Sequence, residues 1–388
     1  MGDCRIKESG TKRKMVNITK NIWDFCRNET VFIVAVLLAV LSAVIVPPSM
    51  EYFTYLDYRV LALLFSLMLI VAGIRKQGIF SLLGEKLIQR VRSTRQLELV
   101  LVGLCFFSSM LITNDVALIT FVPFTIELLV ETGMSGRLIR VVVLQTIAAN
   151  LGSILTPIGN PQNLFLYSLA DMSMRKFILL MLPLTAASLI IFVVMIGKSG
   201  KEEIQARVLL ASEIGIHPQK LAGLVILLII CLGTVARLVP WQLSFGIVLG
   251  VGLICYRELF KEVDYCLLGT FAGFFIFVGN MQKITYLSEQ LQKLLKGREF
   301  LVAVGASQII SNVPAAMLLS GFTDNYRALL FGVDVGGLGT LIASLASLIS
   351  YKFYANSPNA RKGRYLLLFS FYNVIFLAIL LPLAGFLL

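Results

Sequence analysis

Two short polar patches interrupt apolar segments of the chain and resemble each other. The first contains Thr113, Asn114 and Asp115, and the second contains Ser311 and Asn312. Amide and hydroxyl side chains donate and accept hydrogen bonds, and a carboxylate can hold a cation or a proton. A bilayer tolerates such polar backbone only where it is buried in protein or lines a cavity. Matching polar interruptions in two halves of a chain are typical of the binding site of a transporter.

Each patch is followed by a segment rich in glycine and polar residues, at 150–163 and at 334–347. A helix broken within the membrane exposes N–H groups on one side of the break, which attract anions, and carbonyl groups on the other, which attract Na⁺. The candidate substrate- and ion-binding residues are Thr113, Asn114, Asp115, Asn150, Gly152, Thr156, Gly159, Asn160, Asn163, Ser311, Asn312, Asp334, Gly336, Thr340 and Ser344.

Two carboxylates, Asp115 and Asp334, fall near the middle of the expected membrane segments, where no Lys or Arg is found. An ionisable residue inside a membrane is costly to bury, so it is treated as functional by default. Either carboxylate could instead cap a helix end, or could do both. We expect a coupling Na⁺ or proton near these two residues and the two asparagines of the patches, Asn114 and Asn312.

The composition is that of a membrane protein. The chain has 388 residues, of which 57% are hydrophobic and 14% charged, and its mean hydropathy is +0.86. The net charge of +12 is scattered over short loops, which argues against a nucleic-acid partner and for a lipid bilayer. The six cysteines form no CxxC pair, and the one histidine, His217, cannot build a zinc site, so no cofactor is expected. The first apolar run lacks a signal-peptide cleavage pattern and is expected to be retained.

The apolar runs predict about nine membrane crossings and two re-entrant hairpins. Apolar spans are expected near 30–46, 59–74, 138–170, 176–197, 220–238, 241–256, 266–280, 325–354 and 365–388. Two of them, 138–170 and 325–354, exceed the roughly 20 residues of one plain crossing and contain the polar interruptions, so each is expected to be a broken helix. Residues 97–131 and 300–322 are expected to form the hairpins, with the polar patches at their tips. Residues 77–96 and 283–298 mix apolar and charged positions and are expected to be surface or connecting helices.

An internal repeat follows from the spacing. Asn114 and Asn312 are 198 residues apart (312 − 114 = 198), and Asn150 and Asp334 are 184 apart (334 − 150 = 184). The span at 220–238 has no counterpart in the first half, so the two repeats are expected to be inverted in the membrane. The expected fold is an all-α polytopic protein. Its segments are a basic N-terminal stretch (1–28), a first repeat (29–197), a loop (198–219), a linker helix (220–238) and a second repeat (239–388).

The distribution of positive charge predicts the orientation. With the N-terminus in the cytoplasm, 25 of the 34 Lys and Arg residues fall in cytoplasmic segments. This asymmetry follows the positive-inside rule. With nine crossings, the C-terminus is expected on the opposite side.

The paired motifs resemble a known superfamily of ion transporters. They read TNDVALITFVPFTI and GSILTPIGNPQNLFLY in the first half, and SQIISNVPAAMLL and VDVGGLGTLIASLASLI in the second. The chain is similar to the superfamily that includes the arsenite permeases, the NhaD-type Na⁺/H⁺ antiporters, the citrate-metal transporters and the divalent anion/Na⁺ symporters. The similarity is greatest to the YbiR-like inner-membrane anion permeases and covers nearly the whole chain after residue 28.

This resemblance implies a homodimer in a bacterial inner membrane, with a scaffold and a mobile transport domain that works as an elevator. In the divalent anion symporters each hairpin tip reads Ser-Asn-Thr, and those side chains contact a substrate carboxylate and flank Na⁺ sites. Here the third residues are Asp115 and Val313. The negative charge of Asp115 weakens the expectation of a dicarboxylate and favours proton or Na⁺ coupling, or a small, weakly charged substrate.

The function expected from the sequence is secondary active transport of a small anion, an inorganic oxyanion or a carboxylate, coupled to Na⁺ or H⁺. The alternative is a Na⁺/H⁺ antiporter or an efflux permease of the arsenite and antimonite type. An intramembrane enzyme would need a nucleophile with a base or a set of metal ligands, which the sequence does not offer. A passive channel would need no inverted pair of broken helices.

Overall fold

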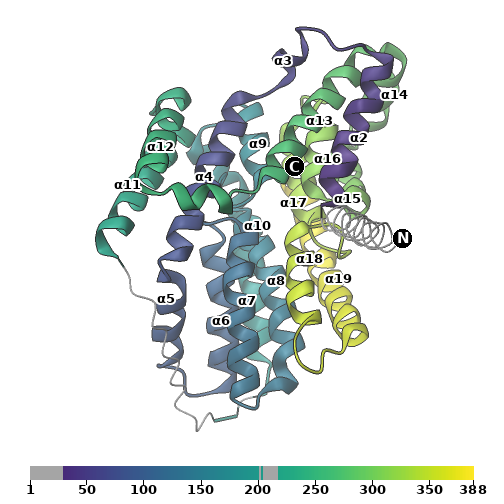
Figure 1. The fold of residues 1–388 in the computed structure, drawn as a ribbon. Helices are drawn as coiled ribbons and strands as arrows, with labels where there is room; N and C mark the ends of the chain where they lie inside the picture. Colours follow the sequence, from purple (N-terminus) through teal and green to yellow (C-terminus); the bar gives the residue numbers. More distant parts are fainter. Residues whose placement is uncertain (1–28, 201, 204–216) are drawn as a thin grey trace, which may run out of the picture. The chain divides into compact units, whose positions relative to one another are not determined.

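The chain is almost entirely helical. The computed structural model describes residues 29–200, 202–203 and 217–388 (Figure 1). The expected basic segment 1–28 and most of the expected loop 198–219 lie outside these residues. Within them the one β-type pairing is a single bridge between Ser93 and Glu203. The prediction of an all-α protein is confirmed.

Several helices are long and apolar enough to cross a membrane, as expected of a polytopic membrane protein. Within the described residues there are five: α4 (Tyr58–Lys76), α10 (Met174–Gly197), α11 (Pro218–Val235), α13 (Tyr265–Lys283) and α19 (Lys362–Leu387). Three shorter apolar helices are α2 (Thr30–Ile45), α12 (Trp241–Cys255) and α15 (Glu299–Ile310).

The chain divides into two compact units, and the smaller one contains α2, α3 (Tyr52–Tyr55) and α13. Helices α2 and α13 pack closely, because Gly273 leaves room for the backbone of Ala35. The amide of Asn280 donates to Ser42 Oγ at 3.0 Å and to the Tyr52 hydroxyl at 2.8 Å. These contacts hold the connection after α2 against the C-terminal part of α13.

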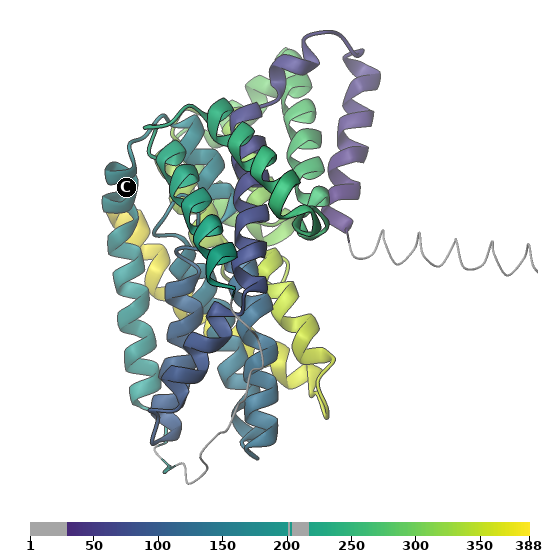
Figure 2. The same ribbon diagram turned by 60° about the vertical axis from the view of Figure 1, so that its left-hand side comes forward.

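The larger unit contains the other helices, and its first half holds the first polar patch. Helices α5 (Ile79–Ile88), α6 (Thr94–Ser108) and α7 (Asn114–Glu131) follow one another, and α8 (Leu138–Ser153) packs against both α6 and α7. Helices α6, α7 and α8 lie side by side in both views (Figures 1 and 2). The polar patch falls at the turn between α6 and α7.

The second half of this unit repeats the arrangement. Helix α14 (Thr285–Leu295) precedes α15 and α16 (Asn312–Ser320), and the second polar patch lies at their junction. Helix α17 (Tyr326–Gly336) packs against both α15 and α16. Two short 3₁₀ turns, Ser135–Arg137 and Arg257–Glu262, connect helices elsewhere in the unit.

Both expected broken helices are interrupted at the expected segments. Helix α8 ends at Ser153 and α9 (Pro161–Leu169) begins after the seven intervening residues 154–160. Helix α17 ends at Gly336, and α18 (Leu345–Ala355) begins after 337–344. Proline at the first position of α9 fits a helix start, because its missing N–H would have no helical partner there. The Asn160 side chain caps α9 by accepting from the Asn163 N–H at 2.9 Å.

Close helix packing in the two halves depends on a matched pair of glycines. A Cβ at Gly152 in α8 would overlap the carbonyl oxygen of Phe106 in α6. A Cβ at Gly336 in α17 would come within 2.9 Å of Ser307 in α15 and 3.0 Å of the Cα of Val304. Both glycines therefore let a broken helix approach the first arm of the hairpin that precedes it.

Candidate functional site

Each polar patch forms a backbone hydrogen bond with the break of the helix that follows it. The Asn114 N–H donates to the carbonyl of Gly159 at 3.0 Å, and the Asn312 N–H donates to the carbonyl of Ala343 at 3.0 Å. The donors are 198 residues apart (312 − 114 = 198) and the acceptors 184 apart (343 − 159 = 184). These are the two offsets of the sequence repeat. The same hydrogen bond therefore occurs at equivalent positions of both halves.

A second pair of hydrogen bonds repeats with the same offsets. The Thr156 hydroxyl donates to the Met110 carbonyl at 2.6 Å, and the Thr340 hydroxyl donates to the Gln308 carbonyl at 3.0 Å. Both threonines were predicted to be site residues. Their hydroxyl protons satisfy carbonyl groups at the ends of α6 and α15, so each threonine holds its break against a hairpin arm.

The first cluster of buried polar side chains centres on Asn150, in the last turn of α8. Its amide oxygen accepts from Asn114 Nδ2 at 3.0 Å and from the Ser344 hydroxyl at 2.9 Å, and its amide nitrogen donates to Ser347 Oγ at 3.2 Å. All four residues are buried. We call this group the amide cluster. It joins the first hairpin tip and the first broken helix to the second half of the chain.

The second cluster centres on Asp334, in the last turn of α17. Asp334 is 3% exposed. Gln162 Nε2 donates to its Oδ1 at 3.3 Å. When the Asn163 amide is oriented so that its nitrogen faces the carboxylate, that nitrogen donates to both Asp334 oxygens at 2.9 and 3.0 Å and to Asn160 Oδ1 at 3.1 Å. We assign this orientation because it satisfies both ends of the amide. We call this group the carboxylate cluster.

The two clusters are equivalent and crossed. Each central residue belongs to one half of the chain and has partners at the start of the helix that follows the break in the other half, and Asn150 has a further partner, Asn114, in its own half. Every matched pair is 184 residues apart, as for the central residues (334 − 150 = 184). The matched pairs are Asn150 with Asp334, Ser344 with Asn160, and Ser347 with Asn163. The candidate residues chosen from the sequence include every cluster member except Gln162 and Ser347, and the crossed pairing emerges only from the structure.

The first break also links the clusters to each other. Asn160 Nδ2 donates to Ser153 Oγ at 3.1 Å, and the Ser153 hydroxyl donates to the carbonyl of Asn150 at 2.8 Å. A continuous chain of hydrogen bonds therefore connects Asp334, through Asn163 and Asn160, to the helix end that carries Asn150. The side chains along this path are all buried.

The remaining predicted residues lie at the hairpin tips. Thr113 precedes α7 and Asp115 lies in its first turn, half-buried. The N-terminal turn of a helix favours a negative charge. The Ser311 backbone has φ of 73°, a conformation that side chains other than glycine rarely adopt, and its hydroxyl lies 3.4 Å from the Ala343 carbonyl. Such backbone strain is often found at functional sites. The Asn312 amide nitrogen lies against Gly337, where a Cβ would come within 2.9 Å.

Two polar residues at the second break were not among the predicted site residues. The Gln308 amide nitrogen donates to the carbonyls of Gly336 at 2.7 Å and Leu338 at 2.9 Å. Asn373, in the middle of α19, accepts from the Gly339 N–H at 3.1 Å. Asn373 is a lone amide in an apolar run, and that pattern could have revealed it. Gln308 replaces Met110 of the first half, so comparison of the repeats gave no signal.

The arrangement offers groups for binding both anions and cations. Amide and hydroxyl hydrogens of the tips can donate to an oxyanion, and amide oxygens and the Asp334 carboxylate can coordinate Na⁺. Among the described residues, no three His, Cys, Asp or Glu side chains gather in a way that could hold a metal ion.

Comparison with known proteins gives the family. Residues 21–325 match the citrate transporter family, CitMHS. The chain is 30% identical over 339 residues to the uncharacterized transporter MJ0456 of Methanocaldococcus jannaschii, covering 86% of this chain and 91% of that protein. It is 32% identical over 314 residues to the inner membrane protein YbiR of Escherichia coli, covering 76% and 80%. A shorter match, 32% over 139 residues, covers 36% of this chain and 28% of the silicon efflux transporter LSI3 of Oryza sativa subsp. japonica. The matched breaks, the apolar helices and these relatives agree that the chain is a multi-pass membrane transporter of the CitMHS family.

Proposed function

We propose that this transporter is a secondary active carrier of a small anion, either an inorganic oxyanion or a carboxylate, and that it couples anion movement to Na⁺ or H⁺. The observation that carries the proposal is the pair of crossed clusters around Asn150 and Asp334. Each half of the chain supplies a broken helix and also completes the cluster of the other half. Such a site is suited to exposure on either side of a membrane.

The proposed substrate position is beside the two hairpin tips. Asn114 and Asn312 begin α7 and α16, so N–H groups and helix dipoles at these ends favour an anion. The equivalent hydrogen bonds in the two halves support an arrangement of re-entrant hairpins in inverted repeats. Alternating access would then be an elevator-type movement of the part that carries the clusters.

The proposed coupling group is Asp334, with Asp115 as the second candidate. Burying a carboxylate is costly unless donors, a cation or a proton compensate its charge. Asp334 receives hydrogen bonds from amides of α9, whereas Asn150 at the equivalent position is neutral. The charge difference between the two clusters supports binding of the coupling ion at the carboxylate cluster. Asp115 lies at the first hairpin tip, where a bound anion and a coupled cation would be neighbours.

The substrate class follows from the tips and from the relatives. Asp115 places negative charge where a dicarboxylate would need donors, so a small or weakly charged anion is favoured over a large polyanion. One family description names citrate and one relative is named for silicon efflux. The carboxylates near the tips also support the alternative of a Na⁺/H⁺ antiporter or an arsenite- or antimonite-type efflux permease.

A thermal-shift screen of the purified protein, followed by flux measurements, tests this proposal. The probes are citrate, succinate, sulfate, phosphate, arsenite and silicic acid, each with and without Na⁺ or Li⁺. At least one anion is expected to raise the melting temperature in a cation- or pH-dependent manner and to accumulate in proteoliposomes under a Na⁺ or H⁺ gradient. Exchange of Na⁺ for protons without any anion would instead identify the antiporter alternative.

The cellular setting is part of the same proposal. We propose a bacterial inner membrane, a cytoplasmic N-terminus, an external C-terminus and a homodimer. The excess of Lys and Arg in the segments assigned to the cytoplasm supports this orientation.

A further inference from the structure

A pocket of about 340 Å³ lies at the turn between α11 and α12, within the larger unit. It shares no residue with the amide cluster or the carboxylate cluster. Two arginines, Arg59 and Arg237, line it together with Thr234 and Trp241. Its volume falls within the ~300–1,000 Å³ typical of small-molecule sites. Charge of one sign in a concave surface of this size is the first indication of an anion site.

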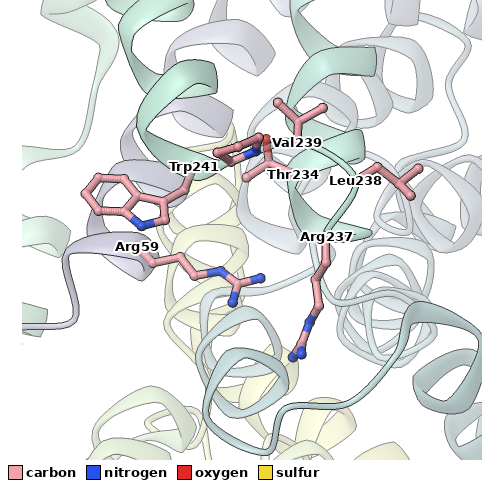
Figure 3. Close-up of a pocket in the computed structure, with 7 residues that line it drawn as sticks. Arg59, Thr234, Arg237, Leu238, Val239 and Trp241 are labelled. Atoms are coloured by element: carbon pink, nitrogen blue, oxygen red, sulfur yellow. The ribbon is translucent and has the colours of Figure 1, made fainter.

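The two guanidinium groups reach the pocket from different elements. Arg59 lies in the first turn of α4, and Arg237 follows the end of α11. Figure 3 shows both side chains extending from the pocket walls toward the same open region, with Trp241 beside Arg59. Helix α12 begins at Trp241, so its N-terminal dipole adds to the positive potential. A planar guanidinium binds carboxylate, sulfate and phosphate groups through paired hydrogen bonds.

Arg237 has an unusual backbone conformation. Its φ is 65°, in the left-handed region, directly after a helix end. Glycine or asparagine is the usual residue in such a position, because a longer side chain is strained there. Arg237 therefore carries backbone strain, which is often found at functional sites.

The partners of the two arginines differ. Arg237 forms an ion pair with Asp171, whose side chain is 82% exposed, and its guanidinium lies 5.7 Å from the ring centre of Tyr167. An exposed ion pair contributes little, so an arriving anion can displace it. Among the described residues, none forms an ion pair or a hydrogen bond with the Arg59 side chain. The pocket therefore presents one guanidinium ready for an anion and a second held by an exposed carboxylate.

We propose that this pocket binds an oxyanion between the guanidinium groups of Arg59 and Arg237, and that Asp171 competes with the oxyanion for Arg237. The group bound is a carboxylate, a sulfate or a phosphate. It comes either from a soluble anion or from the headgroup of an anionic lipid. The site is separate from the proposed transport site and does not depend on it.

The first arm of the test measures binding of a soluble anion to the purified full-length protein. Sodium sulfate is titrated against sodium chloride at matched ionic strength, and binding is followed by thermal shift and calorimetry. For a soluble occupant, Arg59→Gln and Arg237→Gln are expected to weaken sulfate binding roughly tenfold or more, because each removes a charge-assisted pair. Asp171→Asn is expected to tighten it by roughly threefold, because the competing carboxylate is lost.

The second arm tests a lipid headgroup. The protein is placed in nanodiscs of phosphatidylglycerol or of phosphatidylcholine, and retained lipid is counted by native mass spectrometry. If the occupant is a lipid phosphate, phosphatidylglycerol is retained by the wild type and lost from Arg59→Gln and Arg237→Gln, while sulfate binds weakly in all variants.

Two control variants separate binding from folding. Arg175→Gln removes an exposed arginine from the start of α10, outside the pocket, and is expected to leave sulfate and lipid binding unchanged. Arg237→Gly relieves the backbone strain, so it is expected to melt no lower than the wild type while losing oxyanion binding. The proposal is overturned if neither sulfate nor phosphatidylglycerol binds saturably, or if binding is the same in the wild type and in both Gln variants.

Discussion

At the scale of single residues, the main contrast is between Asn150 and Asp334, which occupy equivalent positions with different charge. Both accept hydrogen bonds from the half of the chain to which they do not belong. A neutral amide is satisfied by such bonds alone, whereas a buried carboxylate also favours a cation or a proton. The carboxylate cluster is therefore the position that we propose for the coupling Na⁺ or proton.

Asp334→Asn is expected to leave a folded protein whose transport no longer responds to one of the two gradients. The substitution keeps the size and the hydrogen-bonding capacity of the side chain but removes its charge. Uptake into proteoliposomes under separate Na⁺ and pH gradients measures the response, with Asp115→Asn as the parallel variant. If Asp334→Asn follows both gradients as the wild type does and Asp115→Asn does not, the coupling role belongs to Asp115.

At the scale of elements, the broken helices depend on close contact with the hairpin arms. Gly152→Ala and Gly336→Ala are each expected to destabilise the protein by about 1–3 kcal/mol, because the new methyl group meets backbone or packed atoms that cannot move freely. Gly103→Ala in α6 is the matched control, since nothing lies within 4 Å of its Cβ position. It is expected to change stability by less than about 1 kcal/mol. Melting temperatures in one detergent provide the comparison, and equal losses in all three variants would contradict it.

A buried ion pair ties several helices of the larger unit together. Glu98 in α6 is 1% exposed and accepts from Arg140 Nε in α8 at 2.6 Å. Arg140 also donates to the Tyr372 hydroxyl in α19 and to the Met195 carbonyl in α10, each at 3.0 Å. Removing Glu98 would leave Arg140, whose side chain is 29% exposed, without its ion-pair partner inside the helix bundle. This ion pair is therefore expected to be structural.

Glu98→Gln should lower the free energy of unfolding by up to about 3–5 kcal/mol, as for a broken buried pair. The control is Glu202→Gln, whose carboxylate is 72% exposed and pairs with Arg137 at 3.3 Å. Its effect is expected to stay within about 1 kcal/mol. Denaturation monitored by near-ultraviolet circular dichroism distinguishes the two. A loss no larger in Glu98→Gln than in Glu202→Gln would show that the buried pair contributes little.

The sequence predicted the elements well because hydropathy and helix-breaking residues act locally. Both breaks, at 154–160 and 337–344, and both hairpin tips lie within the segments identified by their glycine, proline and polar residues. The partners of those residues could not be predicted, because periodicity does not show which half of the chain completes which cluster. The contact of Asn150 with Ser344 and Ser347, and that of Gly339 with Asn373, depend on packing between distant segments.

At the scale of the whole molecule, the first question is orientation. The positive-inside rule predicts a cytoplasmic N-terminus and an external C-terminus. Alkaline phosphatase fused after Leu388 is therefore expected to be active in bacterial cells, while green fluorescent protein at the same position stays dark. The reverse pattern would require a different number of crossings or an inverted orientation.

We propose that both halves of the chain build one transport site. The most direct measurement is uptake into proteoliposomes of the anion found in the thermal-shift screen, by Asn114→Ala, by Asn312→Ala and by the double variant. The control is Asn356→Ala, which changes an exposed asparagine at the end of α18. We expect that each single variant folds but loses uptake, that the double variant loses no more, and that the control transports normally. Uptake at the wild-type rate by either Asn114→Ala or Asn312→Ala would contradict it.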